Sequence, residues 1–185
     1  MLREETQSTP SVDHPSLRSV EGRLIWFESN GSVPNHPEWP LIVYEDCWTG
    51  DTGEIENVYR SNNWGGTWRN GIYSYHHYHS NAHEVLGVVN GSAVVLFGGP
   101  APGGVALELS AGDVAVLPAG TGHKRESSGG RLLVVGGYPK SCPGWNLKKA
   151  RSDPPSQIMS DIRDTSSPSG DPIYGDAGPL VDTWQ

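Results

Sequence analysis

The chain has 185 residues, of which 35% are hydrophobic and 18% charged, and its formal net charge at pH 7 is -8. This length favours one domain with additional arms over two domains. Because the chain is acidic and lacks a basic run, it is a poor candidate for binding nucleic acid or an anionic membrane. The 24 glycines and 15 prolines indicate many turns, and we expect an all-β architecture.

The two cysteines and the N-terminal residues indicate a reducing compartment. Cys47 and Cys142 form no CxxC pattern, so we expect two reduced thiols. The first ten residues lack an apolar signal region, and no long apolar run follows anywhere in the chain. We therefore expect a soluble cytoplasmic protein.

The first part of the chain contains two short apolar segments between polar ones. Residues 1–16 are polar, and we expect them to be disordered. Residues 24–27 and 41–44 have the composition of strands, and 54–59 could form a helical turn. Trp64 and Trp68 follow. They could line the mouth of a barrel or plug its end, and we expect plugging because large aromatic side chains are usually core residues.

The stretch from Gly71 to Gly91 contains residues that can bind a metal. If 72–79 is a strand, alternate side chains share one face, and that face carries Tyr73, Tyr75, His77 and His79. A second strand begins at Glu84, and Asn90-Gly91 predicts a hairpin turn that pairs residues 84–89 with 92–97. His77, His79 and Glu84 could then meet.

A further imidazole lies downstream. Residues 113–117 have the pattern of a buried strand that Pro118 ends, and Gly120 and Gly122 predict a tight turn before a strand that begins at His123. Residues 105–109 lead to this stretch, and a further strand is expected at 131–135.

Together these two stretches resemble the two sequence motifs of the cupin family. The first motif is matched by Gly71, His77, His79, Glu84 and Gly91, and the second by Gly112, Pro118, Gly120 and His123. The Asn that often closes the second motif is replaced by Ser127. The resemblance implies a jelly-roll barrel (a double-stranded β-helix), commonly dimeric, with His77, His79, Glu84 and His123 as metal ligands near one mouth.

Three imidazoles and one carboxylate form a nitrogen and oxygen donor set. Such a set suits Fe, Mn, Ni, Cu or Zn, and it lacks the thiolates of a structural zinc site. We expect one divalent transition metal per chain, with Fe first among these. Four protein ligands leave two positions open in an octahedral metal, and these could take water, dioxygen or a chelating substrate.

Neighbouring residues receive other roles. By strand alternation His76 points away from His77, and His83 points away from Glu84, so we interpret both as outer-face or supporting residues. Tyr73 and Tyr75 share the expected ligand face, and they are candidates for pocket walls or hydrogen-bond donors.

The C-terminal part has a different composition. We expect a barrel with N-terminal strands over residues 17–140 and an arm over 141–185 that packs on it. One short helix is expected within 153–164, beginning near Pro154-Pro155. The tail is rich in Ser, Pro and Gly, but its apolar residues indicate docking, namely Ile173, Tyr174, Leu180, Val181 and Trp184.

The resemblance extends to function. Residues 68–93 and the segment 171–180 resemble small single-domain cupins of fungal polyketide gene clusters, which implies an oxidoreductase, with oxygenase activity one option, acting on a small polyketide-derived aromatic substrate. A redox-neutral isomerase, cyclase or dehydratase remains an alternative, as does a non-catalytic protein that binds a small molecule. Folds host many reactions, so the motifs leave these alternatives open.

Overall fold

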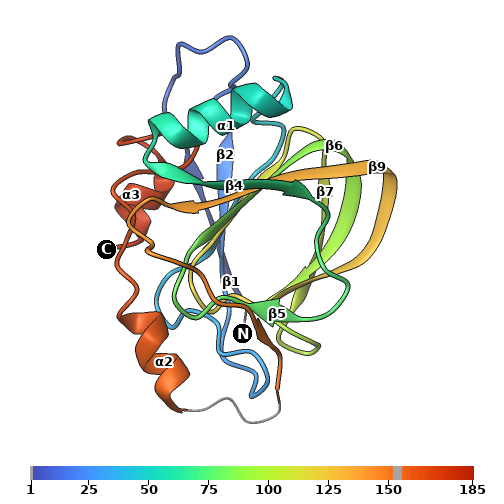
Figure 1. Ribbon diagram of the computed structural model, residues 1–185, viewed down its shortest axis with the longest axis vertical. Coiled ribbons are helices and arrows are strands. Elements are labelled where there is room, and N and C mark those ends of the chain that lie inside the picture. The colour runs from blue at the N-terminus through green and yellow to red at the C-terminus, as the bar shows by residue number, and fades with distance from the viewer. Residues whose placement is uncertain (1, 152–155) are drawn as a thin grey trace.

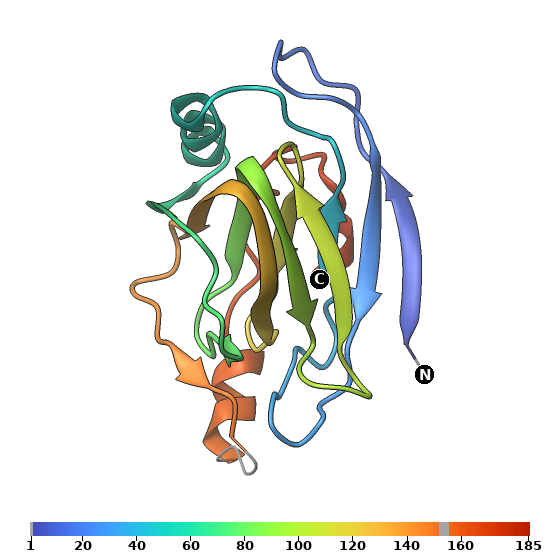
Figure 2. The same ribbon diagram turned by 90° about the vertical axis from the view of Figure 1, so that its right-hand side faces the viewer.

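The computed structural model describes residues 2–151 and 156–185, which contain ten strands and three helices. The strands are β1 (Arg3–Ser8), β2 (Glu21–Trp26), β3 (Leu41–Tyr44), β4 (Trp64–Asn70), β5 (His77–Tyr78), β6 (Glu84–Phe97), β7 (Val105–Ser110), β8 (Val114–Leu117), β9 (His123–Pro139) and β10 (Lys148–Lys149). They form one antiparallel sheet in the order β1-β2-β3-β8-β6-β9-β5-β10, with β4 added to β9 and β7 added to β6. Figures 1 and 2 show this sheet curling into an open barrel, as the all-β jelly-roll expectation requires.

Two long bent strands, β6 and β9, pair with each other along most of their length and carry the curvature. The first half of β6 also pairs with β8, and its second half pairs with β7. The predicted hairpin at Asn90-Gly91 is therefore wrong, since the chain continues there as one strand with register shifts. Gly91 has φ +70°, and a Cβ on it would lie 2.6 Å from the carbonyl oxygen of Gly129. Glycine thus permits a bend with close strand contact where a turn was expected.

Apolar side chains form two main cores. One lies inside the barrel, where alternate residues of β6, β7 and β8 meet, including Leu86, Val95, Phe97, Leu109 and Ala115. The other lies on the opposite face of the sheet under helix α1 and the C-terminal residues, including Tyr44, Ile55, Tyr59, Trp64 and Trp184. A strand buried on both faces explains the continuous apolar sequence of β3 and β8.

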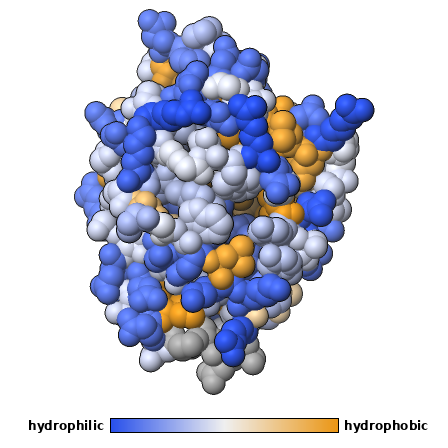
Figure 3. All heavy atoms as spheres, in the orientation of Figure 1, coloured by the Kyte–Doolittle hydropathy of each residue, from blue (hydrophilic) through white to orange (hydrophobic). Residues whose placement is uncertain are grey.

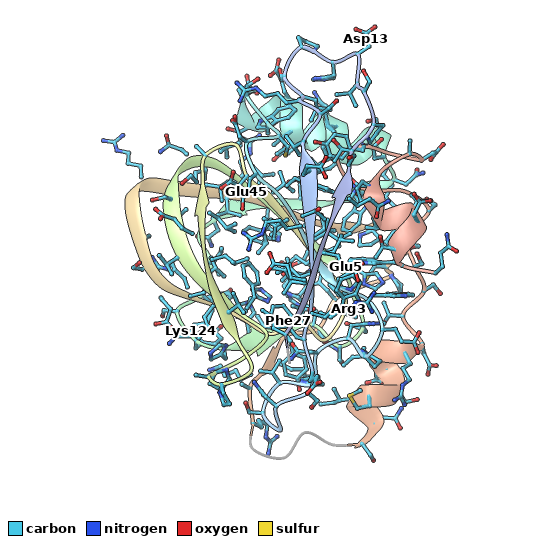
Figure 4. The ribbon with its side chains drawn as sticks, turned by 180° about the vertical axis from the view of Figure 1, so that it is seen from behind. Arg3, Glu5, Asp13, Phe27, Glu45 and Lys124 are labelled. Carbon is cyan, nitrogen blue, oxygen red and sulfur yellow. The ribbon has the colours of Figure 1, made fainter. Side chains whose placement is uncertain are left out.

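The N-terminal residues form a strand, which the sequence did not predict. We expected disorder over residues 1–16, but β1 occupies Arg3–Ser8 and pairs antiparallel with all six residues of β2. Its side chains are mostly exposed, so backbone pairing rather than apolar burial holds it, and Arg23 on β2 forms an ion pair with Glu4 at 2.8 Å. Figure 4 shows β1, which carries the labelled Arg3 and Glu5, beside β2 at the edge of the sheet.

Helix α1 (Thr52–Ser61) is longer than the helical turn that we expected at 54–59. Asp51 begins it with a capping box, accepting hydrogen bonds from the backbone N–H groups of Gly53 and Glu54, while the Glu54 carboxylate accepts from the Asp51 N–H. The helix lies across one end of the barrel (Figure 1) and buries Ile55, Val58 and Tyr59.

The C-terminal arm is docked. It carries helix α2 (Ser156–Arg163), as predicted, and a second short helix, α3 (Pro179–Thr183), which was not predicted. Both lie on the same side of the barrel in Figure 1. The predicted start of the first helix near Pro154-Pro155 falls outside the described residues. Leu180 and Trp184 are fully buried, and Trp184 Nε1 donates to the carbonyl of Pro40.

Asp171 anchors this tail. Its carboxylate accepts hydrogen bonds from the backbone N–H groups of Ile173 and Tyr174 and from the hydroxyl of Tyr44 on β3. Burial raises the pKa of Asp171, and these hydrogen bonds offset only part of that shift. A buried carboxylate thus ties the arm to the barrel.

Of the two roles considered for Trp64 and Trp68, plugging the barrel end and lining its mouth, each residue has one. Trp64 is fully buried and donates to the carbonyl of Gly170, so it plugs the end beneath the arm. Trp68 is half-buried and lines a cavity.

The outer surface is mainly polar. On the face in Figure 3, apolar residues form small groups separated by hydrophilic ones. Among the residues that the structure describes, no helix is both long and apolar enough to span a membrane.

Two buried histidines support the arm away from the barrel cavity. His83 accepts a hydrogen bond at Nδ1 from the backbone N–H of Ala119 and donates from Nε2 to the carbonyl of Ser166. His36 stacks on Trp39 at 4.3 Å between ring centroids and accepts at Nδ1 from that residue's backbone N–H. Burial lowers the pKa of His83 to about 4 and that of His36 to about 3.

A matched pair of substitutions tests the docking of the arm. Trp184 is 1% exposed and Trp145, also in the arm, is 51% exposed. We expect Trp184→Ala to lower the free energy of unfolding by about 3–5 kcal/mol because it leaves a large cavity, whereas Trp145→Ala should change it by less than about 1 kcal/mol. Urea unfolding measures both. Equal small losses would show that the tail does not stabilise the barrel.

The buried histidines predict acid sensitivity. Their folded pKa values lie below the unfolded value of about 6.5, so the unfolded state binds more protons between these limits. Stability should therefore fall as the pH drops from about 6.5 towards 4, by up to about 1.4 kcal/mol per pH unit for each histidine. Thermal unfolding from pH 7 to 4.5 measures this slope. His36→Gln should make it shallower, and an unchanged slope in that variant would contradict the assignment.

Candidate metal centre

Three histidines from two segments of the chain meet inside the barrel. His77 on β5 is the register partner of His123 at the start of β9, and His79 follows β5 directly. One ring nitrogen from each of the three lies within 4.8 Å of the others. All three side chains are at most 5% exposed. The sheet register thus brings together His77 and His123, which are 46 residues apart in the chain.

Each imidazole is oriented by a backbone carbonyl. Nδ1 of His77 lies 3.1 Å from the carbonyl oxygen of Tyr75, and Nδ1 of His123 lies 3.1 Å from that of Thr121. Nδ1 of His79 contacts the carbonyl oxygen of Asn146 in the arm. Because a carbonyl only accepts, each Nδ1 carries a proton, and Nε2 is the nitrogen that can take a metal or a second proton. This is the tautomer in which metal-binding histidines are usually held.

Glu84, the first residue of β6, lies beside two of the three imidazoles. Its Oε2 lies 3.2 Å from Nε2 of His79 and 3.3 Å from Nε2 of His123. Although buried, Oε2 has no aligned hydrogen-bond donor among the described residues. A carboxylate oxygen facing imidazole lone pairs in a buried site requires a cation between them, either protons or a metal ion. The donor set and this orphaned oxygen fit a bound transition metal.

The electrostatics of the four side chains follow from burial and from one another. Burial lowers the pKa of His77 to about 3, so its ring is neutral at pH 7. Burial alone would raise the pKa of Glu84, but His79 and His123 lower it further than burial raises it. Burial alone would lower the pKa of His79, but the Glu84 carboxylate outweighs this and raises it. The Glu84 carboxylate is therefore ionised, and its negative charge stabilises positive charge on its neighbours.

The approach to β5 differs from the sequence prediction. We expected a strand over 72–79, but only His77–Tyr78 is a strand, and residues 71–76 are irregular. The backbone of residues 71–76 makes isolated hydrogen bonds to two different segments instead of pairing along one strand. The Tyr73 carbonyl accepts from the Arg125 N–H, and the His76 carbonyl accepts from the Ala150 N–H. Strict side-chain alternation thus does not apply before His77. The rings of Tyr73 and Tyr75 nevertheless lie 5.2 and 5.6 Å from that of His77.

The two histidines that we assigned other roles from the sequence, His76 and His83, lie outside this group. Both nitrogens of His83 are engaged by Ala119 and Ser166, as described above. His76 is half-buried, and burial lowers its pKa. Among the described residues, the cluster of close metal-binding nitrogens contains only His77, His79 and His123.

A cavity of about 240 Å³ opens onto the four side chains. Trp68 was considered as a lining residue from the sequence, but Tyr138 and Trp145 were missed. Tyr138 at the end of β9 donates to Glu84 Oε1 at 3.1 Å, and Trp68 Nε1 donates to the Tyr138 oxygen at 3.2 Å. Trp145 stacks on Tyr138 and contacts His79 edge-on. No motif marks these residues, because a bent strand and an arm far along the chain bring them to the site.

Comparisons with known proteins agree with this architecture. Residues 68–141 match the sequence profile described as "Cupin". "Uncharacterized protein YjlB" of Bacillus subtilis (strain 168) is 37% identical over 164 residues, covering 89% of this chain and 97% of that protein.

Solved structures with a similar fold are more distant. Vicilin from Solanum lycopersicum is 16% identical, with a TM-score of 0.39 over 61% of this chain and 30% of its own. An oxalate decarboxylase formate complex from Lactobacillus farciminis is 21% identical, with a TM-score of 0.36 over 69% of this chain and 31% of its own. The chain thus spans about a third of the length of these proteins.

Metal content in paired variants tests the candidate donors. We expect His77→Ala to lose bound metal, because it removes one of three converging nitrogens, whereas the adjacent His76→Ala should retain it. His83→Ala should also retain the metal. It should lower the free energy of unfolding, because it leaves the Ala119 N–H and the Ser166 carbonyl without a partner, and each such buried group costs about 1–3 kcal/mol. Elemental analysis of purified protein gives the comparison. An empty His76→Ala with a loaded His77→Ala would contradict the arrangement.

Proposed function

The chain belongs to the cupin family, and from this premise we propose that it is a metal-dependent oxidoreductase acting on a small aromatic compound. The observation that carries the proposal is the convergence of three buried imidazoles in the wall of the cavity, with Glu84 Oε2 beside two of them. Packing alone would favour apolar side chains here, whereas all four of these polar side chains are buried.

His77, His79, His123 and Glu84 would hold the metal, for which iron is our first choice and Mn, Ni, Cu or Zn are the alternatives. A transition metal in such a site supplies Lewis acidity and can bind dioxygen beside the substrate. The chain's own contribution is orientation. The carbonyls of Tyr75, Asn146 and Thr121 fix the three rings.

Aromatic walls support a flat substrate. Tyr73 and Trp145 are two of the three exposed large hydrophobic residues in the described part of the chain, and both line the cavity. Each ring stacks on another, Tyr73 on Tyr75 at 5.0 Å and Trp145 on Tyr138 at 5.3 Å between centroids. One pair contacts His77 and the other contacts His79. A planar ring between the two pairs would cover apolar surface that is otherwise in water.

Arg69 on β4 supports an acidic or phenolic group on this substrate. It lines the cavity, and Glu56 holds its Nε and Nη2 at 2.8 and 3.1 Å. This ion pair engages one edge of the guanidinium and leaves Nη1 with two N–H donors. A positioned guanidinium suits an anionic oxygen.

The remaining parts of the proposal rest on the sequence. The resemblance of residues 68–93 to polyketide-cluster cupins supports a polyketide-derived substrate in secondary metabolism. A cytoplasmic homodimer that binds neither nucleic acid nor membrane stays a prediction from composition and family.

Oxygen consumption tests the proposed reaction class. We expect the protein loaded with Fe(II) to consume dioxygen in the presence of salicyl alcohol or salicylaldehyde, and the Glu84→Gln variant to consume at least 100-fold less, because an amide is a poor substitute for a carboxylate ligand. Product formation from these compounds without dioxygen would indicate a redox-neutral enzyme. Tight binding that is unaffected by metal removal, without turnover, would indicate a binding protein. Either result would overturn the proposal.

A further inference from the structure

The two oxygens of Glu84 have different environments. Oε2 faces the imidazoles, whereas Oε1 accepts the hydroxyl proton of Tyr138 at 3.1 Å. A metal-binding carboxylate can use one oxygen or both. The environment of Oε1 therefore decides how many positions around the metal Glu84 would occupy.

Tyr138 is held so that its hydroxyl points at Oε1. Trp68 Nε1 donates to the Tyr138 oxygen at 3.2 Å, so the hydroxyl proton is directed to its other neighbour, Glu84. The ring is fixed by stacking on Trp145 and by an edge-on contact with His79.

We propose that Tyr138 is a positioning residue that restricts Glu84 to binding the metal through Oε2 alone, which keeps one further coordination position open for substrate or dioxygen. This inference rests on the proposed metal-dependent function. A carboxylate that binds through both oxygens would fill one of the two positions that four donors leave in an octahedral metal. The Tyr138 hydrogen bond competes with that second contact. The residue acts through Glu84 and does not touch the metal.

Tyr138→Phe is the direct variant, because it removes the hydroxyl and keeps the ring that stacks on Trp145. Tyr59→Phe is the matched control. It removes another buried hydroxyl, which bonds the Val135 carbonyl at 3.4 Å in the core beneath α1. Both variants should unfold within about 1 kcal/mol of the wild type, as expected for one weak or moderate hydrogen bond.

The readout is water-proton relaxation by Mn(II), with protein in excess so that all the metal is bound. It reports the number of exchangeable waters on the metal and does not depend on turnover. Two open positions in the wild type and one in Tyr138→Phe predict that the inner-sphere relaxivity falls to about half. Tyr59→Phe should match the wild type.

The outcomes separate the two proposals. Equal relaxivity in wild type and Tyr138→Phe, with Mn(II) bound in both, would overturn the role of Tyr138 and leave the metal site standing. No relaxation enhancement in the wild type would overturn the metal site and the role of Tyr138 together. A loss in Tyr59→Phe as large as that in Tyr138→Phe would show a general effect of losing a buried hydroxyl, and it would also overturn the inference.

Discussion

The central constraint in this molecule is electrostatic. Three imidazoles meet at one buried place, an ionised carboxylate lies beside two of them, and the buried negative charge requires positive charge nearby. The backbone keeps the three rings in this orientation, because each Nδ1 contacts a backbone carbonyl. The strand register of β5, β6 and β9 is what places these side chains together.

Residues of both the barrel and the arm form this site. The barrel supplies all four donors, but the orientation of His79 depends on Asn146, and one cavity wall on Trp145, both from the arm. The tail beyond these residues is in turn anchored by Asp171 and by the burial of Leu180 and Trp184 against the outer core. Loss of the tail therefore weakens the support of the arm that orients one of the donors.

The sequence predicted the donors better than their surroundings. Paired motifs with fixed spacing predict His77, His79, Glu84 and His123 as ligands, and the structure brings the three imidazoles together with Glu84 beside two of them. The bend at Gly91 was mistaken for a hairpin because Asn-Gly is compatible with both, and only long-range pairing with β9 distinguishes them. The capping box at Asp51 and Glu54 was a local signal for α1 that could have been found. Tyr138 and Asn146 could not, since tertiary contacts alone bring them to the site.

Anomalous diffraction from crystals of protein purified without chelator tests the central claim most directly. The account predicts one transition-metal peak per chain, bound by Nε2 of His77, His79 and His123 and by Oε2 of Glu84, with Tyr138 still bonded to Oε1. Absence of a peak between these four atoms, in crystals that show the side chains ordered, would contradict it. So would a metal held through Nδ1 of any of the three rings, because the backbone carbonyls would then not be the groups that orient them.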